Sequence, residues 1–306
     1  MRALAIALLL AGSWSARAAS DSLPPLPVYD QIAGAERDYV VQPGDMVWSI
    51  TGRFTMTRAL LDALNTLPDP DHLRPGMHLR VSDRHIVPRR GSDDIVIDLA
   101  TRTLYWFRRG ALHAHFPVGI GRLDWATPIG RYRIVGRRED PVWHVPDSIQ
   151  AEMRARGERV VARVEPGPEN PLGKYLLRLS VPGYALHGTN APGSVGKYAT
   201  HGCLRLRNED VERLYRDAPD GTRVDVIYEP VKVARDGDTV FLEVHRDVRG
   251  TGAADLGAVL ALLANARLAD AVDAERVAAV TARAWGTPED VSRAVAPPAL
   301  VPASGQ

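Results

Sequence analysis

Thr200-His201-Gly202-Cys203-Leu204-Arg205 contains the only cysteine of this 306-residue chain. A cysteine nucleophile needs a thiolate, a nearby base, backbone donors for an oxyanion and access for the substrate. Gly202 allows the backbone to approach a substrate closely, and the N–H groups of Gly202 and Cys203 can face an oxyanion. In an extended segment Arg205 shares the face of Cys203, where its charge is expected to lower the pKa of the thiol and to bind a carboxylate. The stretch therefore indicates a reactive cysteine rather than the inert, buried thiol that is common for this residue type.

Two histidines are candidates for the base. His201 lies two positions before Cys203, and His187 lies sixteen positions before it, in Leu186-His187-Gly188-Thr189-Asn190. Spacing alone does not choose between them. A zinc site is a weak alternative because no close pair of ligands is repeated, so we expect neither a metal nor another cofactor. The remaining histidines of this region fit scattered surface groups: His113, His115 and His144.

The N-terminus has the features of an export signal. Met1-Arg2 is basic, Ala3 to Ala11 is apolar, and Ala16-Arg17-Ala18 fits a cleavage site, so residues 1–18 are expected to be a signal peptide. The apolar run is too short to span a bilayer, which disfavours the alternative of a membrane anchor. Export also bears on the role of the lone cysteine. An exported protein that uses cysteine structurally carries an even number of cysteines, whereas this chain has one.

Composition and length indicate a globular protein with one large core and a small companion domain. The chain is 45% hydrophobic and 25% charged with a formal net charge of +1, which excludes the clustered basic surface of a nucleic-acid-binding protein. Residues 19–38 contain proline and aspartate without periodicity and are expected to form a linker.

Residues 39–82 predict a strand, two helices and a strand. Asp45 is expected to cap the first helix and Thr57 the second. This unit resembles a LysM domain in Tyr39-Val40-Val41-Gln42-Pro43-Gly44-Asp45, Trp48-Ser49-Ile50, Asn65 and Leu73-Arg74-Pro75-Gly76-Met77-His78-Leu79. The resemblance implies binding to peptidoglycan or another glycan built on N-acetylglucosamine, whereas Thr55-Met56-Thr57 departs from the usual turn. The alternative is a degenerate packing module.

Residues 93–229 predict mostly β-structure, with short runs of β-branched and aromatic residues and one helix that Asn208 is expected to cap. This region resembles the L,D-transpeptidase catalytic domain, also called the YkuD domain. The pieces that match, in the family's order, are Ile97-Asp98, Pro117-Val118-Gly119-Ile120-Gly121, Thr127-Pro128-Ile129-Gly130-Arg131-Tyr132, His187-Gly188-Thr189-Asn190, Ser194-Val195-Gly196 and Thr200 to Leu206. The resemblance implies a mainly β, β-sandwich-like domain.

The resemblance also implies roles for individual residues. Cys203 corresponds to the nucleophile and His187 to the proton donor and acceptor, with the Gly188 carbonyl orienting its ring. His201 and Gly202 correspond to the oxyanion pocket. The implied substrate-binding residues are Arg205, Thr189 and Asn190.

The implied activity is attack by Cys203 on the tetrapeptide stem of peptidoglycan, release of D-Ala, and transfer of the acyl group to an amine. The stretch Pro166 to Tyr175 resembles the periplasmic subgroup from Gram-negative bacteria, which implies a periplasmic protein. The acceptor stays open between diaminopimelate, in a crosslink for the cell wall, and an outer-membrane lipoprotein. The alternatives are a carboxypeptidase or endopeptidase in which water resolves the same thioester, and, from a different class, a non-catalytic wall-binding protein.

Residues 230–306 predict two short strands followed by an Ala-rich helical tail. Helices are expected over 255–268 and 271–285, and Thr287-Pro288-Glu289-Asp290 has the composition of the start of a third. The role of the tail stays open, as does the oligomeric state.

The lone cysteine generates a direct prediction. Cys203→Ala is expected to abolish turnover of purified tetrapeptide muropeptides, because the chain has no second thiol that can form the covalent intermediate. Mass spectrometry of the muropeptides measures turnover, and circular dichroism checks that the variant is folded. Processing at the wild-type rate by folded Cys203→Ala would rule out the cysteine mechanism.

Overall fold

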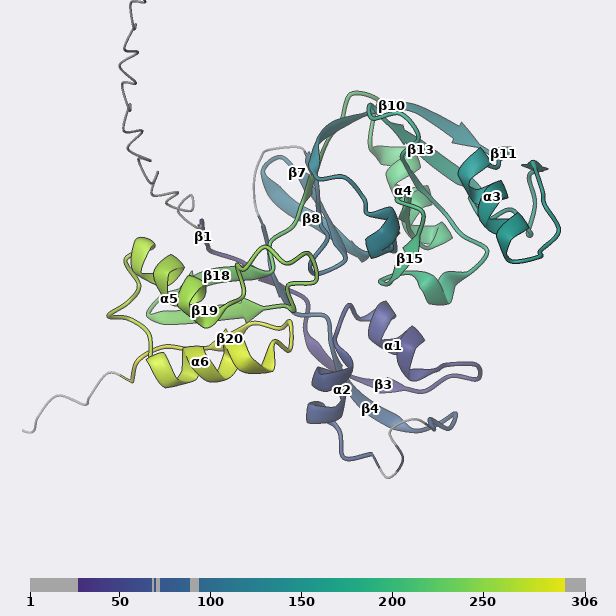
Figure 1. The fold of residues 1–306 in the computed structure, drawn as a ribbon. Helices are drawn as coiled ribbons and strands as arrows, with labels where there is room; N and C mark the ends of the chain where they lie inside the picture. Colours follow the sequence, from purple (N-terminus) through teal and green to yellow (C-terminus); the bar gives the residue numbers. More distant parts are fainter. Residues whose placement is uncertain (1–26, 68, 70–71, 89–93, 295–306) are drawn as a thin grey trace, which may run out of the picture.

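The computed structural model describes residues 27–67, 69, 72–88 and 94–294, and the expected signal peptide at residues 1–18 lies outside them. The chain forms three packed units, which we name the small unit (residues 36–82), the large unit (residues 94–227) and the C-terminal unit (residues 231–294) (Figure 1). Strand accounts for 33% of the described residues and helix for 23%, which confirms the expected mainly β class.

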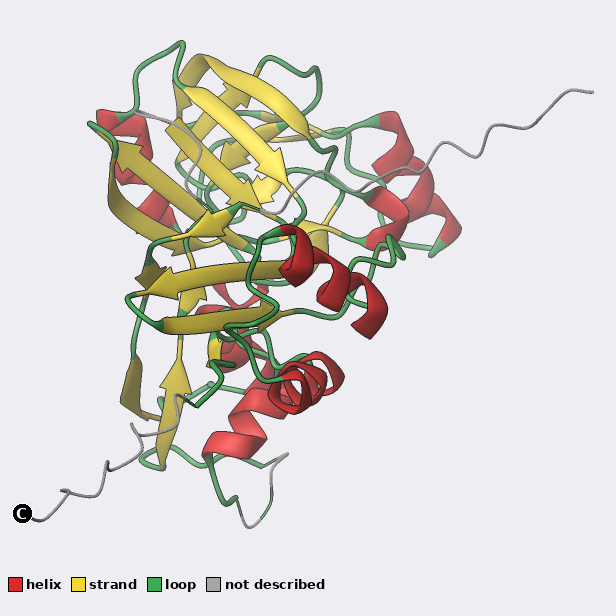
Figure 2. Ribbon diagram, turned by 90° about the vertical axis from the view of Figure 1, so that its left-hand side faces the viewer, coloured by secondary structure: helices red, strands yellow, loops and turns green. Residues whose placement is uncertain are grey.

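An eight-stranded sheet dominates the large unit, in the order β16-β14-β13-β10-β17-β6-β7-β8 (Figure 2). Neighbouring strands are antiparallel except for the pairs β14–β16 and β17–β6, which are parallel. Helix α4 (Asn208–Asp217) supplies the connection from β16 to β17. The bounds are β6 (Asp94–Asp98), β7 (Thr103–Arg108), β8 (Ala111–Pro117), β10 (Gly130–Glu139), β13 (Tyr175–Leu179), β14 (Ala185–His187), β16 (Leu204–Arg205) and β17 (Arg223–Ile227).

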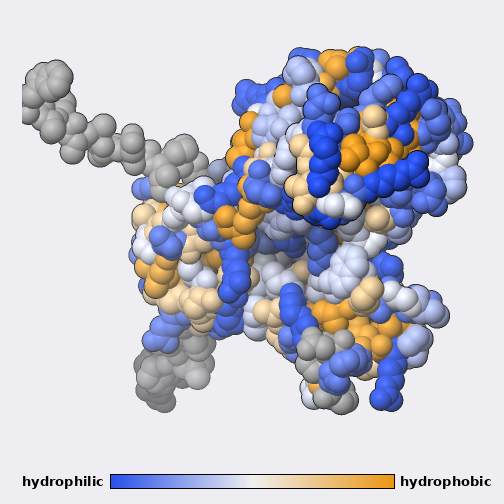
Figure 3. All heavy atoms as spheres, turned by 45° about the vertical axis from the view of Figure 1, so that its right-hand side comes forward, coloured by the Kyte–Doolittle hydropathy of each residue, from blue (hydrophilic) through white to orange (hydrophobic). Residues whose placement is uncertain are grey.

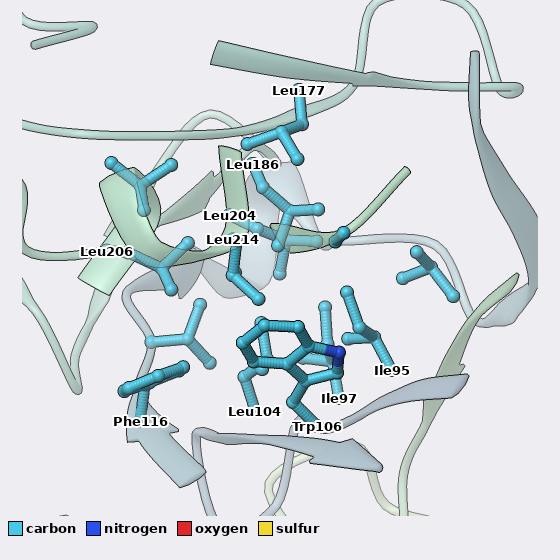
Figure 4. Close-up of a cluster of buried hydrophobic side chains, with 14 of the residues drawn as sticks. Ile95, Ile97, Leu104, Trp106, Phe116, Leu177, Leu186, Leu204, Leu206 and Leu214 are labelled. Carbon is cyan, nitrogen blue, oxygen red and sulfur yellow. The ribbon is translucent and has the colours of Figure 1, made fainter. Parts of the chain in front are cut away.

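The two ends of this sheet share one hydrophobic core. Leu104 and Trp106 of β7 belong to the same buried cluster as Leu186 of β14 and Leu204 of β16, although these strands lie far apart in the sheet order (Figure 4). Helix α4 adds Leu214 to the cluster. The sheet therefore curves around its own core, as expected for a sandwich-like domain, and the burial of both ends stabilises the short strand β16.

Shorter elements cover the open end of this core. Strand β9 (Ile120–Gly121) pairs in parallel with β15 (Tyr198–Thr200), and β11 (Trp143–His144) pairs with β12 (Arg163–Val164). The other elements of the unit are η1 (Leu123–Trp125), α3 (Asp147–Ala155) and η2 (Pro192–Ser194).

The small unit has the expected order of strand, helix, helix and strand: β3 (Glu36–Val40), α1 (Val47–Arg53), α2 (Arg58–Leu64) and β4 (His78–Ser82). Thr57 caps α2 as predicted, because its Oγ1 accepts a hydrogen bond from Leu60 N at 3.1 Å. The predicted cap of α1 is wrong. Met46 occupies the cap position, since the carboxylate of Asp45 is held instead by Tyr39, Gln42 and Arg53.

The described part of the expected linker at residues 19–38 is paired into sheets. Strand β1 (Val28–Tyr29) lies parallel to β18 (Val231–Asp236), and β2 (Ile32–Ala33) pairs with β5 (His85–Ile86). Backbone pairing on both sides thus attaches the small unit to its neighbours.

The C-terminal unit has its own core beneath two helices. Its elements are β18 (Val231–Asp236), β19 (Thr239–Val244), α5 (Leu256–Asn265), α6 (Ala274–Arg283) and β20 (Glu289–Asp290). Both expected helices are confirmed. The expected third helix is wrong, because residues 289–290 extend the sheet by pairing with β19.

A buried charge network joins the three units. Lys232 Nζ lies 2.7 Å from Asp98 Oδ2 and 3.5 Å from Glu243 Oε1. The same Glu243 oxygen lies 2.8 Å from His85 Nδ1 and 2.7 Å from His245 Nε2. All five residues are buried. These contacts connect β5, which follows the small unit, with β6 of the large unit and with the C-terminal sheet.

Burial by itself lowers the pKa of Lys232, but Asp98 and Glu243 outweigh that effect, so the pKa is raised. Burial likewise raises the pKa of Glu243, but Lys232 and His85 bring it well below its usual range. Lys232 and Glu243 therefore stay charged at neutral pH. Each depends on the other, because an unpaired buried charge is costly.

We expect Lys232→Met to lower the free energy of unfolding by about 3–5 kcal/mol at pH 7, because it leaves two carboxylates buried without their cation. Lys174→Met is the matched control, since the side chain of Lys174 is 54% exposed in a surface pair with Glu139 and such pairs contribute about 0–1 kcal/mol. Urea denaturation measures both variants. Equal losses for the two would show that the network does not hold the units together.

Candidate active site

The parallel pairing of β14 and β16 positions the chemical groups. Leu186 pairs with Leu204, and His187 pairs with Arg205. Both leucines point into the core, so His187 and Arg205 project from the opposite face, because side chains alternate along a strand. Cys203 precedes Leu204 and lies on that same face, near the backbone of Ala185. The structure thus brings together Cys203, His187 and Arg205.

The thiol of Cys203 is partly exposed, and its Sγ lies 3.5 Å from the carbonyl oxygen of Gly183. Burial raises the pKa of Cys203, whereas a hydrogen bond from the backbone of Ala185 and the charge of Arg205 act to lower it. Arg205 thus acts to lower the pKa of the thiol, as expected. The effect of burial is larger, so the pKa of Cys203 is raised overall. The resting cysteine is a neutral thiol.

His187 is buried, with 3% of its surface exposed, and its Nδ1 lies 2.7 Å from the carbonyl oxygen of Gly188. A carbonyl only accepts hydrogen bonds, so Nδ1 carries the proton and Nε2 is left as the basic nitrogen. Burial, and then the charge of Arg205, lower the pKa of His187 to about 4, against the opposing effect of the Gly188 and Leu172 carbonyls. The ring is neutral at pH 7 and can accept a proton.

Asn208 is a positioning residue that sequence reasoning did not identify. Its Oδ1 accepts from Thr189 N at 2.9 Å and its Nδ2 donates to the Thr189 carbonyl at 3.0 Å. A Cβ atom at Gly188 would lie 2.1 Å from Asn208 Oδ1, so the loop packs tightly on this amide. The predicted helix cap at Asn208 is wrong, since Arg207 occupies the cap position. Asn208 instead holds the loop whose Gly188 carbonyl orients His187.

The two expected substrate-binding residues of this loop differ in exposure. Thr189 is buried, and its Oγ1 accepts from Ala191 N at 2.9 Å. Asn190 is exposed and donates to the Glu169 carbonyl at 3.0 Å. Both residues line a cavity of about 260 Å³ that the segment 167–174 closes. The side chain available to a ligand is therefore that of Asn190, while Thr189 shapes the loop.

Gly202 makes the turn that precedes the nucleophile. Its φ is +104°, a conformation that favours glycine, and a Cβ atom there would lie 2.7 Å from the ring of Tyr184. Its carbonyl accepts from Thr127 Oγ1 at 2.8 Å, and its N–H donates to Thr200 Oγ1 at 3.1 Å. The Gly202 N–H can therefore serve an oxyanion only by exchanging this acceptor.

His201 is tied to helix α3. Its Nε2 lies 2.5 Å from Glu152 Oε2, and its ring packs edge-on against Trp125 with centroids 5.1 Å apart. Glu152 also pairs with Arg122 at 3.2 Å. Nε2 of His201 is therefore engaged by a carboxylate, and this pair fixes the ring against helix α3. Glu152 was not identified from the sequence, because it lies 49 residues away from its partner.

The guanidinium of Arg205 is partly engaged by its neighbours. Its Nη1 donates to Ser194 Oγ at 2.8 Å, and within the described part of the chain its buried Nε has no hydrogen-bond partner. Burial lowers the pKa of Arg205, and contact with Cys203 opposes that shift. The guanidinium lies beside the thiol, and its charge is suited to a carboxylate of the substrate.

Among the described residues, three ligand groups of the kind that binds metals come together only at His85, Glu243 and His245, in the buried charge network. His113, His115 and His144 belong to no such group within the described ranges.

The low pKa of His187 predicts the pH dependence of acylation. The imidazole loses its charge as the pH rises through about 4, so the acylation rate constant is expected to stay level from pH 7 down to about pH 5 and to fall below that. Stopped-flow measurement of acylation across pH 3.5–8 tests this expectation. A decline centred on the usual histidine value, about 6.5, would contradict a buried neutral base.

Comparison with known proteins agrees with this geometry. Residues 92–226 match the model of the L,D-transpeptidase catalytic domain (YkuD), and residues 39–82 match the LysM domain. The chain is 38% identical over 199 residues to the probable L,D-transpeptidase YbiS of Escherichia coli, a match that covers 63% of this chain and 65% of YbiS, somewhat under two thirds.

Other relatives are matched over more of their length. The probable L,D-transpeptidase ErfK/SrfK of Salmonella typhimurium is 33% identical over 246 residues, with 77% of this chain and 79% of that protein covered. Among solved structures, L,D-transpeptidase 3 of Mycobacterium tuberculosis in complex with a faropenem-derived adduct is 18% identical with a TM-score of 0.35, covering 67% of this chain and 97% of that one. With a catalytic-domain match that contains Cys203 and His187 and with relatives aligned over most of their length, the chain belongs to the L,D-transpeptidase family of YkuD type and carries a LysM domain.

Proposed function

We propose that this protein is a cysteine L,D-transpeptidase that acts on the tetrapeptide stem of peptidoglycan through a thioester on Cys203. The observation that carries the proposal is the register of β14 and β16, which pairs His187 with Arg205, two residues after Cys203. Membership of the family supports the reaction class, and the LysM domain supports peptidoglycan as the partner.

The first half-reaction follows from the two protonation states. As the sulfur of Cys203 attacks the carbonyl between diaminopimelate and the terminal D-Ala, Nε2 of His187 takes the thiol proton. The carbonyl becomes an oxyanion next to the N–H groups of Cys203 and Gly202, with His201 shaping the wall of the pocket. The C–N bond then breaks, the proton passes from His187 to the departing amine, and D-Ala leaves the thioester.

In the second half-reaction an acceptor amine attacks the thioester, gives a proton to His187 and forms a new amide, and the proton returns to sulfur. Diaminopimelate of a second stem and a lysine of an outer-membrane lipoprotein are both amines of this kind. Water as acceptor would make the same site a carboxypeptidase or endopeptidase. The exposed amide of Asn190 and the terminal nitrogens of the Arg205 guanidinium are the groups we propose for contacts with carboxylates and amides of a stem.

A periplasmic location completes the proposal, because peptidoglycan lies outside the cytoplasmic membrane and the first 18 residues have the pattern of a cleaved signal peptide. No helix among the described residues is long and apolar enough to cross a membrane.

Variants of His187 and His201 test which histidine is the base and which one shapes the wall of the oxyanion pocket. His187→Ala is expected to slow acylation by a purified tetrapeptide muropeptide about 10²- to 10⁴-fold, the usual contribution of a positioned base. His201→Ala is expected to slow it less, since we propose that His201, held by Glu152 and Trp125, shapes the pocket and does not move the proton. Rapid-quench measurement of the acyl-enzyme compares them. Near-normal acylation in His187→Ala together with a large loss in His201→Ala would exchange the two assignments.

A carbapenem is expected to acylate Cys203 and to add its mass to the protein, because the groups that stabilise the oxyanion of a peptide also serve a strained lactam. Intact-protein mass spectrometry of the wild type measures the adduct, and Cys203→Ser is the control. A stable adduct of equal yield in Cys203→Ser would show that another residue reacts.

A further inference from the structure

A cavity of about 690 Å³ lies where the small unit meets the large unit. Helix α1 contributes Trp48 and Thr51 to one wall, while Arg102, Lys197 and Tyr198 of the large unit form the other. We name this cavity the inter-unit cleft; Figure 3 shows the two units that border it as separate bodies on one face of the molecule.

The two walls are held against each other by close packing. A Cβ atom at Gly52 of α1 would lie 2.6 Å from the Val195 carbonyl oxygen, and one at Gly193 would lie 2.8 Å from the Trp48 ring. Lys197 Nζ donates to Thr51 Oγ1 at 2.7 Å. The small unit is thus docked on η2 and the residues after it, so the cleft has a defined shape rather than being a gap between tethered domains.

The cleft contains two cations that face each other. Burial, and then the charge of Arg102, lower the pKa of Lys197 to about 8. Arg102 donates to the Thr55 carbonyl at 3.1 Å and lies 5.8 Å from the centroid of the Tyr198 ring. Within the described part of the chain, neither cation forms an ion pair with an acidic side chain. Like charges in a partly buried site are unfavourable unless an anion joins them.

The other charged groups lining the cleft are already paired. Arg58 pairs with Asp62 at 2.8 Å, and His72 pairs with Asp69 at 2.7 Å. Asp45 is engaged by Tyr39 and Arg53. The charge left for a ligand is therefore the positive charge of Lys197 and Arg102, beside the ring of Trp48, which is 46% exposed.

We propose that the inter-unit cleft binds a carboxylate-bearing saccharide strand, with the sugar against Trp48 and Tyr198 and a carboxylate of an attached peptide between Lys197 and Arg102. This inference rests on the proposed function, because it names the part of peptidoglycan that reaches the site from outside. Strand β15 runs from Tyr198 to Thr200, three residues before Cys203, and Ser194 of η2 holds Arg205. A saccharide strand bound in the cleft therefore lies beside the catalytic face. The small unit and the large unit together then form one substrate site.

Calorimetric titration of full-length protein carrying Cys203→Ser tests the proposal without turnover. The probes are a disaccharide tetrapeptide, the same compound with its carboxylates amidated, and neutral chitotetraose. Adding Lys197→Gln is expected to weaken binding of the first probe about tenfold, the usual effect of losing one charge-assisted hydrogen bond, and to leave the other two unchanged. Lys197→Arg is expected to restore binding.

Arg235→Gln is the matched control, because Arg235 is a half-exposed cation of the C-terminal unit that pairs only loosely with Asp238, at 3.8 Å. Unchanged affinity of Lys197→Gln for the disaccharide tetrapeptide would overturn the proposal. An equal loss for chitotetraose would also overturn it, because Lys197 would then only maintain the shape of the cleft.

Turnover of a free tetrapeptide without sugar, measured with the wild type, separates this proposal from the one on which it rests. If the wild type turns over the free tetrapeptide and Lys197→Gln does not change binding, the proposed binding in the cleft is rejected and the proposed transpeptidase activity is retained. No turnover together with the expected loss of binding would keep the cleft as a glycan site and reject the catalytic proposal.

Discussion

The catalytic arrangement depends on the parallel pairing of two very short strands, β14 and β16. Their leucines, Leu186 and Leu204, are fully buried, and this burial sets the face from which His187, Cys203 and Arg205 project. A shift of one residue in this register would turn the leucines outward and the catalytic groups into the core, so the hydrophobic pattern and the chemistry enforce each other. Asn208 then holds the loop that follows β14, which keeps the carbonyl of Gly188 on Nδ1 of His187.

Burial of this face explains the chemistry more than any single contact does. It raises the pKa of Cys203 and lowers that of His187, so both groups are neutral before substrate arrives. A neutral thiol beside a neutral imidazole reacts by proton transfer during the attack rather than from a preformed ion pair. Arg205 opposes the cost of negative charge on sulfur. The buried network around Lys232 has a comparable role between the units, since it makes their relative placement costly to change.

Much of this could be predicted from the sequence where the information is local. The His-Gly-Cys stretch indicated the reactive thiol. Short runs of β-branched and aromatic residues indicated most strands of the sheet, and the helix before β17 was also predicted. The errors arose where a side chain had a partner far along the chain. Asp45 and Asn208 were both assigned as helix caps from their neighbours, but the first is held by Tyr39 and Arg53 and the second by the backbone of Thr189. Strands β1 and β2 were missed because each is only two residues long and is stabilised by pairing with distant strands.

The central claim is that Cys203 carries the acyl group of the stem. Rapid-quench mass spectrometry of the full-length wild type mixed with a disaccharide tetrapeptide measures this directly. The account predicts a transient adduct whose mass equals that of the substrate minus D-Ala, mapped by proteolysis to the peptide that contains Cys203 and absent from Cys203→Ser. Turnover that proceeds at the wild-type rate without any such adduct, or an adduct on a different residue, would contradict it.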